Sequence, residues 1–300
     1  MIFRAAPVRI AVWGDGMKLC VSSYGFYWTR EKTLEGLIAV VNKAAEMGFE
    51  GIEFMEYDEV GLKEAKALRA ACAAAGITPV NLCCGAHFAT PFASETDAQV
   101  EELKRRVDVA AELGCEFLRH DAARGPLPEP YPQTYAAAVT FMAEGIRRVT
   151  EYAASVGVKT LTENHGQFSQ DARRVESLIK AVAHPNFGAL VDIGNFMCVD
   201  EDPPVSVAVL APYARHVHCK DFLFRPASEA DSCADWLTTR GGNKLRGCNI
   251  GCGAAQAERS VKILKAAGYD GWWSIEYEGS DPPEKGIREG TENLKRYLSE

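Results

Sequence analysis

Residues 159–192 read KTLTENHGQFSQDARRVESLIKAVAHPNFGALVD. This stretch contains two short β-rich runs, Lys159–Glu163 and Gly188–Asp192. The segment between them has apolar residues at helical spacing, at Val175, Leu178, Ile179 and Val182. Two strands separated by a helix predict a crossover unit, in which both strands lie parallel in one sheet.

The same alternation of strand and helix patterns recurs from Met17 to the end of the chain. Many of the predicted helices end in a glycine, which is typical of a left-handed cap; these are Gly48, Gly76, Gly114, Gly157 and Gly268. The predicted strands are Lys18–Ser22, Gly51–Phe54, Pro79–Cys83, Phe117–His120, Lys159–Glu163, Gly188–Asp192, His216–Lys220 and Trp272–Tyr277.

Eight strand and helix units of ~35 residues suit a closed barrel. We therefore predict an α/β fold, a (β/α)8 TIM barrel forming a single domain over residues 17–300, with residues 1–16 as an N-terminal extension. A doubly wound open sheet is the alternative, but the first loop, Ser23–Trp28, lacks the glycine fingerprint that binds phosphate. The irregular stretch Phe222–Gly253 follows the seventh strand, and we expect it to be a loop on the catalytic face.

The composition is that of an ordinary globular protein. Of the 300 residues, 47% are hydrophobic and 25% are charged, and the net charge of −8 disfavours a general affinity for nucleic acid. No apolar run approaches the ~20 residues that span a bilayer, and the ten cysteines are scattered along the chain. We expect a cytoplasmic protein with reduced thiols and no membrane partner.

Residues that can bind a metal lie near the ends of the last four predicted strands. In a barrel of parallel strands the active site lies at the carboxyl ends, and alternate side chains point inward. Two glutamates, an aspartate and a histidine would form a site rich in oxygen ligands, suited to one Mn²⁺, Mg²⁺ or Co²⁺ ion and tolerated by Zn²⁺. These residues are Glu163, Asp192, His218 and Glu276.

Together these motifs resemble those of the sugar phosphate isomerase/epimerase superfamily, which has the xylose isomerase-like TIM barrel. The resemblance covers nearly all of the chain from Met17 and implies that the four residues are metal ligands, with Glu163 and Glu276 also serving as acid and base. Asn195 and Cys252 stand where relatives often have His and Glu. The motifs are Glu163-Asn164-His165-Gly166, Val191-Asp192-Ile193-Gly194-Asn195-Phe196, His216-Val217-His218-Cys219-Lys220-Asp221 and Ser274-Ile275-Glu276-Tyr277-Glu278-Gly279.

The predicted function is that of a sugar isomerase or epimerase that depends on a divalent metal. It would act on a keto-sugar or related polyol by removing a proton next to a metal-bound carbonyl, through an enediolate. The alternative within enzymes is a metal-dependent lyase or dehydratase of the inosose dehydratase type. A non-catalytic sugar-binding barrel and an enzyme resembling abasic-site endonucleases are further alternatives, although six histidines and the net charge of −8 disfavour the latter.

Seven further residues are candidates for binding the substrate, and each also has a purely structural interpretation. Lys220 could simply form a salt bridge, and His165 could cap a turn. His87 could be an ordinary loop residue, and Glu53 could support a neighbouring side chain. We expect a small carbohydrate as the partner, and a homo-oligomer is the default assembly. The seven candidates are His165, Asn195, Lys220, His87, Glu53, Trp28 and Arg246.

Overall fold

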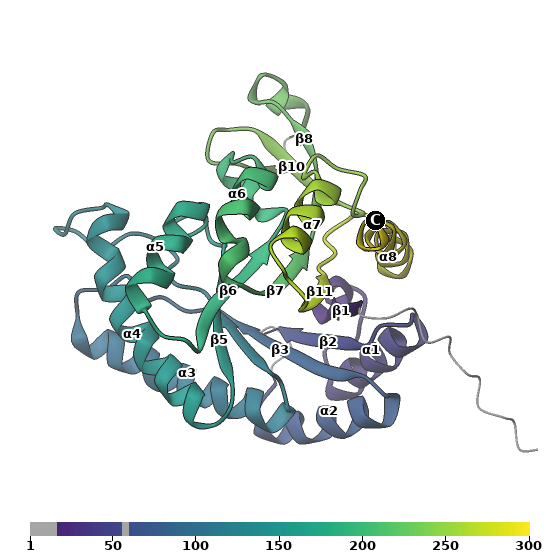
Figure 1. Ribbon diagram of the computed structural model, residues 1–300, viewed down its shortest axis with the longest axis horizontal. Coiled ribbons are helices and arrows are strands. Elements are labelled where there is room, and N and C mark those ends of the chain that lie inside the picture. Colours follow the sequence, from purple (N-terminus) through teal and green to yellow (C-terminus); the bar gives the residue numbers. More distant parts are fainter. Residues whose placement is uncertain (1–16, 56–59, 234) are drawn as a thin grey trace, which may run out of the picture.

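The structure is a computed structural model that describes residues 17–55, 60–233 and 235–300. Eight parallel strands close into a barrel in the order β1-β11-β7-β6-β5-β4-β3-β2, which confirms the predicted fold (Figure 1). Three strands have the predicted bounds, and the other five differ by one or two residues at one or both ends. The barrel strands are β1 (Lys18–Ser22), β2 (Gly51–Met55), β3 (Thr78–Cys84), β4 (Phe117–His120), β5 (Lys159–Glu163), β6 (Phe187–Asp192), β7 (Ala214–Cys219) and β11 (Trp272–Ile275).

The helices lie outside the barrel and pack against their neighbours in chain order (Figure 1). Each of the five expected glycines has a positive φ, between 72° and 85°, as predicted for residues that end a helix. The helices are α1 (Leu34–Glu46), α2 (Leu62–Ala75), α3 (Ala93–Leu113), α4 (Tyr135–Ser155), α5 (Ala172–Val182), α6 (Pro203–Leu210), α7 (Ala257–Ala266) and α8 (Pro283–Ser299).

The interior of the barrel has an apolar layer and a polar layer. Leu161 and Leu190 belong to the apolar layer, and two residues further along the same strands Glu163 and Asp192 belong to the polar one. Because successive side chains of a strand point to opposite faces, residues two apart share the inward face. The apolar layer consists of Cys20, Val80, Phe117, Leu161 and Leu190, with Trp272 packed against it.

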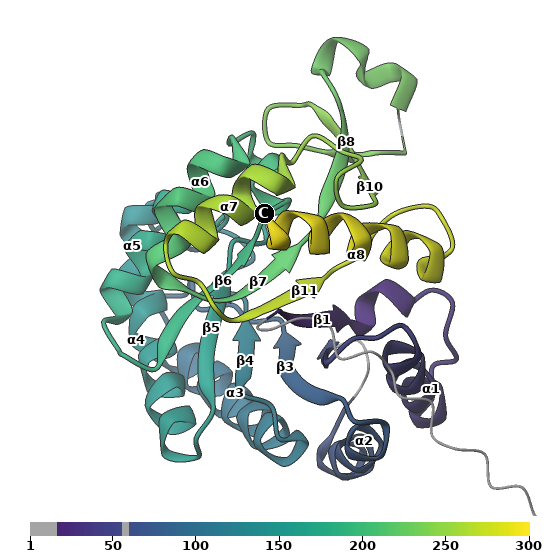
Figure 2. The same ribbon diagram turned by 45° about the vertical axis from the view of Figure 1, so that its right-hand side comes forward.

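The segment 222–253 is not the irregular loop that the sequence predicted. It forms an antiparallel sheet in the order β8-β10-β9, with a 3-10 helix, Ala227–Cys233, after the first strand. Strands β9 and β10 form a hairpin with a short connection, but β8 pairs with β10 across a long intervening segment, so no short turn signal marks that pairing. Figure 2 shows this sheet standing beyond the carboxyl ends of the barrel strands. Its strands are β8 (Asp221–Arg225), β9 (Leu237–Thr238) and β10 (Lys244–Cys248).

Asp221 connects this sheet to the turn that precedes α7. Its carboxylate accepts four backbone N–H bonds of 2.9–3.0 Å, from Phe222, Gly251, Gly253 and Ala255. The carboxylate is buried, and the four bonds replace the water that it loses.

Among the described helices, none is both long enough and apolar enough to cross a membrane. The expected N-terminal extension, residues 1–16, lies outside the described part of the chain.

Candidate active site

The four predicted metal ligands converge at the carboxyl end of the barrel. The Nδ1 atom of His218 lies 3.6 Å from Glu163 Oε1, 3.8 Å from Asp192 Oδ2 and 3.5 Å from Glu276 Oε2. One ligand atom from each residue lies within 4.8 Å of all the others, and all four side chains are buried. Strands β5, β6 and β7 and the segment just after β11 supply one residue each, as strand alternation predicts.

Asp192 is fixed by the turn that follows β6. Its Oδ1 atom accepts hydrogen bonds from the backbone N–H groups of Gly194 and Asn195, at 2.7 and 2.8 Å. Asn164 on the neighbouring strand end holds the Asp192 backbone through two hydrogen bonds of 2.9 Å. Only Oδ2 is left to face the other three ligands.

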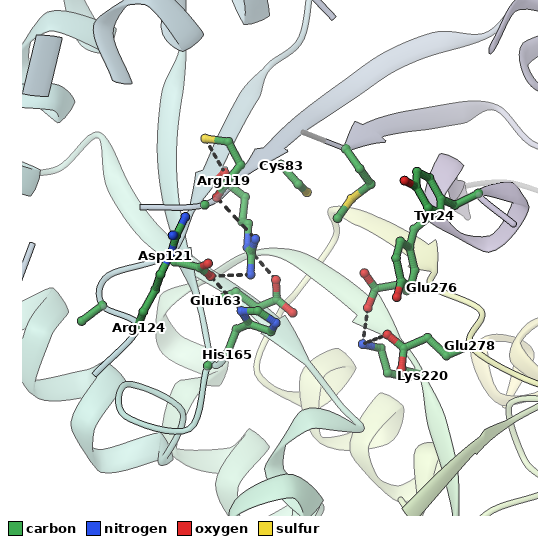
Figure 3. Close-up of a pocket in the computed structure, with 16 residues that line it drawn as sticks. Tyr24, Cys83, Arg119, Asp121, Arg124, Glu163, His165, Lys220, Glu276 and Glu278 are labelled. Atoms are coloured by element: carbon green, nitrogen blue, oxygen red, sulfur yellow. Dashed lines mark hydrogen bonds and ion pairs between the residues drawn. The ribbon is translucent and has the colours of Figure 1, made fainter. Parts of the chain in front are cut away.

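One wall of the site is a chain of charged groups that begins at Glu163. Arg119 Nε lies 2.6 Å from Glu163 Oε2, and Arg119 Nη2 lies 2.8 Å from Asp121 Oδ1. The same Asp121 oxygen lies 2.9 Å from Nδ1 of His165, whose side chain is exposed at the cavity. Figure 3 shows these residues together on one side of the pocket.

The opposite wall is organised by Lys220. Its ammonium forms ion pairs with Glu276 and, at 3.1 Å, with Glu278, and it lies 3.4 Å from Asp192 Oδ2 (Figure 3). Asn195 connects the two walls, because its amide donates to Glu163 Oε1 at 2.8 Å and accepts from Lys220 at 3.3 Å.

Burial and mutual repulsion set the charges of the carboxylates. Burial, together with the nearby Glu276 and Glu163 carboxylates, raises the pKa of Asp192 to about 7 against the pull of Lys220. Burial also favours protonation of Glu276, but Lys220 and His218 hold its pKa well below the usual range. Arg119 and His218 likewise lower the pKa of Glu163 against its burial.

The polar atoms at the centre of this cluster fit a divalent cation. Asp192 Oδ2, His218 Nδ1 and Glu276 Oε2 are buried and make no well-formed hydrogen bond. Among the described cationic side chains on their wall of the site, only Lys220 lies at ion-pair distance from the two carboxylate oxygens. Buried polar atoms without such partners are costly, and three carboxylates around one imidazole repel one another unless a cation lies among them. The set of three oxygen ligands and one nitrogen suits Mg²⁺, Mn²⁺, Co²⁺ or Zn²⁺.

A cavity of about 690 Å³ opens above the cluster and has room for a small sugar. Of the predicted substrate-binding residues, His165 and Lys220 line it. Asn195 is buried between the two walls, and Glu53 is buried within the barrel and does not line the cavity.

The remaining three candidates lie away from this cavity. His87 is half-buried and accepts a hydrogen bond from the Arg124 backbone N–H at 3.1 Å. Trp28 is 81% exposed and lines an adjoining pocket. Arg246, on β10, lines a smaller pocket of about 200 Å³ beside the added sheet.

The cavity also contains residues that were not among the predicted substrate-binding set. Arg119 and Asp121 lie at the end of β4, so the rule that pointed to the later strand ends applies to them as well. Glu278 follows Glu276 by two residues, and Tyr24 comes from the loop after β1. Each of the three charged side chains has a partner distant in sequence, which the sequence pattern does not reveal; these partners are Glu163 for Arg119, His165 for Asp121 and Lys220 for Glu278.

Comparison with known proteins gives a family and several relatives. The model of the family described as xylose isomerase-like TIM barrel matches residues 41–297. A ketose 3-epimerase of Arthrobacter globiformis is 24% identical over 259 residues, which cover 84% of this chain and 81% of that protein.

Two solved structures are similar in fold. A D-psicose 3-epimerase crystallised in the presence of D-fructose superposes with a TM-score of 0.72 at 16% identity, covering 95% of this chain and 100% of the other. The IOLI protein with a bound zinc atom superposes with a TM-score of 0.72 at 17% identity, covering 94% of this chain and 98% of the other.

Proposed function

This chain belongs to the xylose isomerase-like TIM barrel family, and from that premise we propose that it is a divalent-metal-dependent isomerase or epimerase of a keto-sugar or related polyol. The observation that carries the proposal is the convergence of Glu163, Asp192, His218 and Glu276 beneath a cavity of sugar size. The similarity to a ketose 3-epimerase supports the same reaction class.

The proposed reaction divides the work between a cation and two glutamates. A divalent ion held by the four ligands would polarise the substrate carbonyl and make the adjacent C–H bond more acidic. The lowered pKa values of Glu163 and Glu276 keep both carboxylates ionised near neutral pH, so each is ready to accept a proton.

The position of these two glutamates favours epimerisation. Glu163 and Glu276 lie on the two opposite walls of the pocket in Figure 3. If one ionised glutamate removes the proton from one face of the substrate, and the other takes up a proton from water and delivers it to the opposite face, the configuration of the carbon is inverted. A single glutamate that removed the proton and returned it to the neighbouring carbon of the enediolate would instead give an isomer.

Lys220 and His165 are the proposed contacts for substrate hydroxyl or carbonyl oxygens. Both line the cavity, one on each wall. Lys220 lies against Glu276. Its positive charge would therefore also favour loss of the proton from Glu276 whenever that carboxylate has taken one up.

Dehydration is the second candidate reaction, and His165 is the observation that favours it. Desolvation lowers the pKa of His165, but the Asp121 carboxylate outweighs this effect and raises that pKa above the usual value. A protonated histidine at the cavity wall can protonate a departing hydroxyl group.

Proton exchange with solvent tests the proposed function. The protein, saturated with Mn²⁺, would be incubated with a panel of ketoses in D₂O, and the products followed by NMR. We expect deuterium at the carbon next to the carbonyl together with a new epimer or isomer, whereas an unsaturated or dicarbonyl product would indicate dehydration. No deuterium in any ketose, with metal bound, would contradict the proposal.

Matched variants assign the role of the glutamates. We expect Glu163→Gln and Glu276→Gln each to slow exchange by a factor on the order of 10²–10⁴. Glu258→Gln makes the same chemical change at an exposed position on α7, and exchange should not change. Bound metal would be measured in each sample, so that loss of the ion is separated from loss of the base.

We also propose a reducing, cytoplasmic location. All ten cysteines lie in the described ranges, none of them forms a disulfide, and eight are buried. Unpaired thiols are typical of proteins in reducing compartments.

A further inference from the structure

Glu53 is a buried carboxylate that the proposed chemistry does not use. It lies on β2 with none of its side chain exposed, and it does not line the cavity. An ionised carboxylate inside a protein is very costly unless hydrogen bonds or opposite charges compensate for the lost water. The residues around Glu53 therefore indicate why it is there.

Five donor groups surround the carboxylate, two at Oε1 and three at Oε2, the third of these being the Cys83 thiol, whose sulfur lies 4.0 Å from Oε2. At Oε1, Ser274 Oγ donates from 2.9 Å, and His218 Nε2 lies at an ion-pair distance of 2.8 Å without the alignment of a well-formed hydrogen bond. At Oε2, His216 Nε2 lies at 3.0 Å and Asn81 Nδ2 at 3.2 Å. A carboxylate has about four lone-pair sites, so these donors saturate it.

The contact with His218 bears directly on the metal site. The two ring nitrogens of His218 face different groups, because Nε2 lies against Glu53 and Nδ1 faces the other three ligands. A histidine binds a metal through a nitrogen that carries no proton, and the group at its other nitrogen fixes which nitrogen that is.

We propose that Glu53 is the positioning residue of the metal site: it keeps the proton of His218 on Nε2 and orients the ring so that the Nδ1 lone pair points at the cation. The inference rests on the metal site of the proposed function and deepens it, because it assigns to Glu53 control of affinity for the ion. His216, Asn81 and Ser274 hold the carboxylate in place for that task.

The same network reaches a second ligand. Asn81 donates to Glu53 through Nδ2 and, through Oδ1, accepts the backbone N–H of Arg119 at 3.1 Å. Arg119 in turn holds Glu163 Oε2 through its guanidinium. The buried Asn81 amide thus connects the carboxylate that supports His218 to the strand that supports Glu163. We therefore expect a change at Glu53 to affect the positions of both His218 and Glu163.

A second cation does not explain the cluster as well. Glu53, Cys83 and His218 lie close enough together to hold one. However, both Glu53 oxygens are already occupied, and Asn81 Nδ2 lies 3.1 Å from the Cys83 sulfur. We therefore expect one Mn²⁺ ion per chain.

The test moves the buried charge from residue 53 to residue 81 on the adjacent strand instead of deleting it. Glu53→Gln alone leaves an amide N–H group facing the His216 and Asn81 donors, which endangers folding. In the double variant Glu53→Gln/Asn81→Asp the new carboxylate can accept from the glutamine amide and still accept the Arg119 N–H. The His216 ring can accept the second amide hydrogen at Nε2 by carrying its own proton on Nδ1, which has no hydrogen-bond partner among the described residues. The negative charge stays in the barrel, but it no longer lies against His218.

Affinity for Mn²⁺, measured by the EPR signal of the free ion, is the first readout. We expect the double variant to bind 10–100-fold more weakly than the wild type, the usual effect of losing such a partner. Ser274→Ala is the matched control, because it removes a donor to the same Oε1 atom but leaves the carboxylate against His218. Its affinity should change less than about threefold.

A spectroscopic readout separates positioning from a general structural effect. In the Zn²⁺-loaded, ¹⁵N-histidine-labelled wild type, the Nε2 proton of His218 should exchange slowly with water, and in the double variant its exchange should become faster. Unchanged Mn²⁺ affinity and unchanged exchange in a folded double variant would overturn the inference and leave the proposed function intact. A wild type that binds no metal would overturn both.

Discussion

At the scale of single residues, partners distant in sequence decide what a charged side chain does. Lys220 had two competing interpretations, a salt bridge and a substrate contact, and the structure shows the ion pair with Glu276 at a cavity that Lys220 itself lines. Glu53 shows the same limit of prediction. Its position near a strand end was visible in the sequence, but its partners come from residues 81, 216, 218 and 274.

His120 gives a residue-scale prediction about the pH dependence of stability. Its ring is fully buried between Phe88 and Phe187, and burial lowers its pKa to about 4, although the hydrogen bond to the Asp121 carbonyl opposes this shift. Below the ordinary histidine value of 6.5 the unfolded chain takes up a proton that the folded chain does not. The folded state therefore loses stability as pH falls from 6.5 towards 4.

The variant His120→Asn isolates this effect, because its amide can still donate to the Asp121 carbonyl. When the pH falls from 7 to 5, the free energy of unfolding should decrease by about 2 kcal/mol more in the wild type than in the variant. Urea unfolding at the two pH values measures the difference. Parallel pH dependences in the two proteins would show that His120 titrates normally.

At the scale of elements, local patterns predicted the barrel well and the added sheet poorly. Each barrel strand is a short run flanked by its own signals, such as the glycine that ends the preceding helix at Gly114 before β4. Strands β8 and β10 pair across a long intervening segment, and no local rule relates Phe224 to its partner Leu245. Pairing of that kind depends on the whole loop.

The turn before α7 provides an element-scale prediction. A Cβ atom added at Gly253 would lie 2.2 Å from Asp221 Oδ1 and 2.5 Å from the Phe222 carbonyl oxygen. The variant Gly253→Ala should therefore displace the carboxylate that accepts four backbone N–H bonds, and lower the free energy of unfolding by about 2 kcal/mol or more.

Cys252→Ala is the control for this variant, since residue 252 is exposed in the same turn. Its free energy of unfolding should stay within about 0.5 kcal/mol of the wild type. Thermal unfolding compares the three proteins, and equal losses in both variants would mean that Asp221 does not organise the turn.

At the scale of the whole molecule, barrel closure turns dispersed residues into one site. Glu163, Asp192, His218 and Glu276 are spread over more than a hundred residues, and strand order and alternation alone predict that they meet. That regularity explains why the convergence of these four residues could be predicted. The cavity walls depend on loops and long side chains, which have no such repeat, and so Arg119 and Asp121 were not among the predicted substrate contacts.

The central claim is that these four side chains bind one divalent cation. Metal content by mass spectrometry, on protein purified without chelator or metal-affinity resin, tests it most directly beside the double variant His218→Ala/Glu276→Gln. We predict about one divalent ion per chain in the wild type and none in the variant. A wild type without bound metal, and without thermal stabilisation by Mn²⁺, Mg²⁺, Co²⁺ or Zn²⁺, would contradict the account.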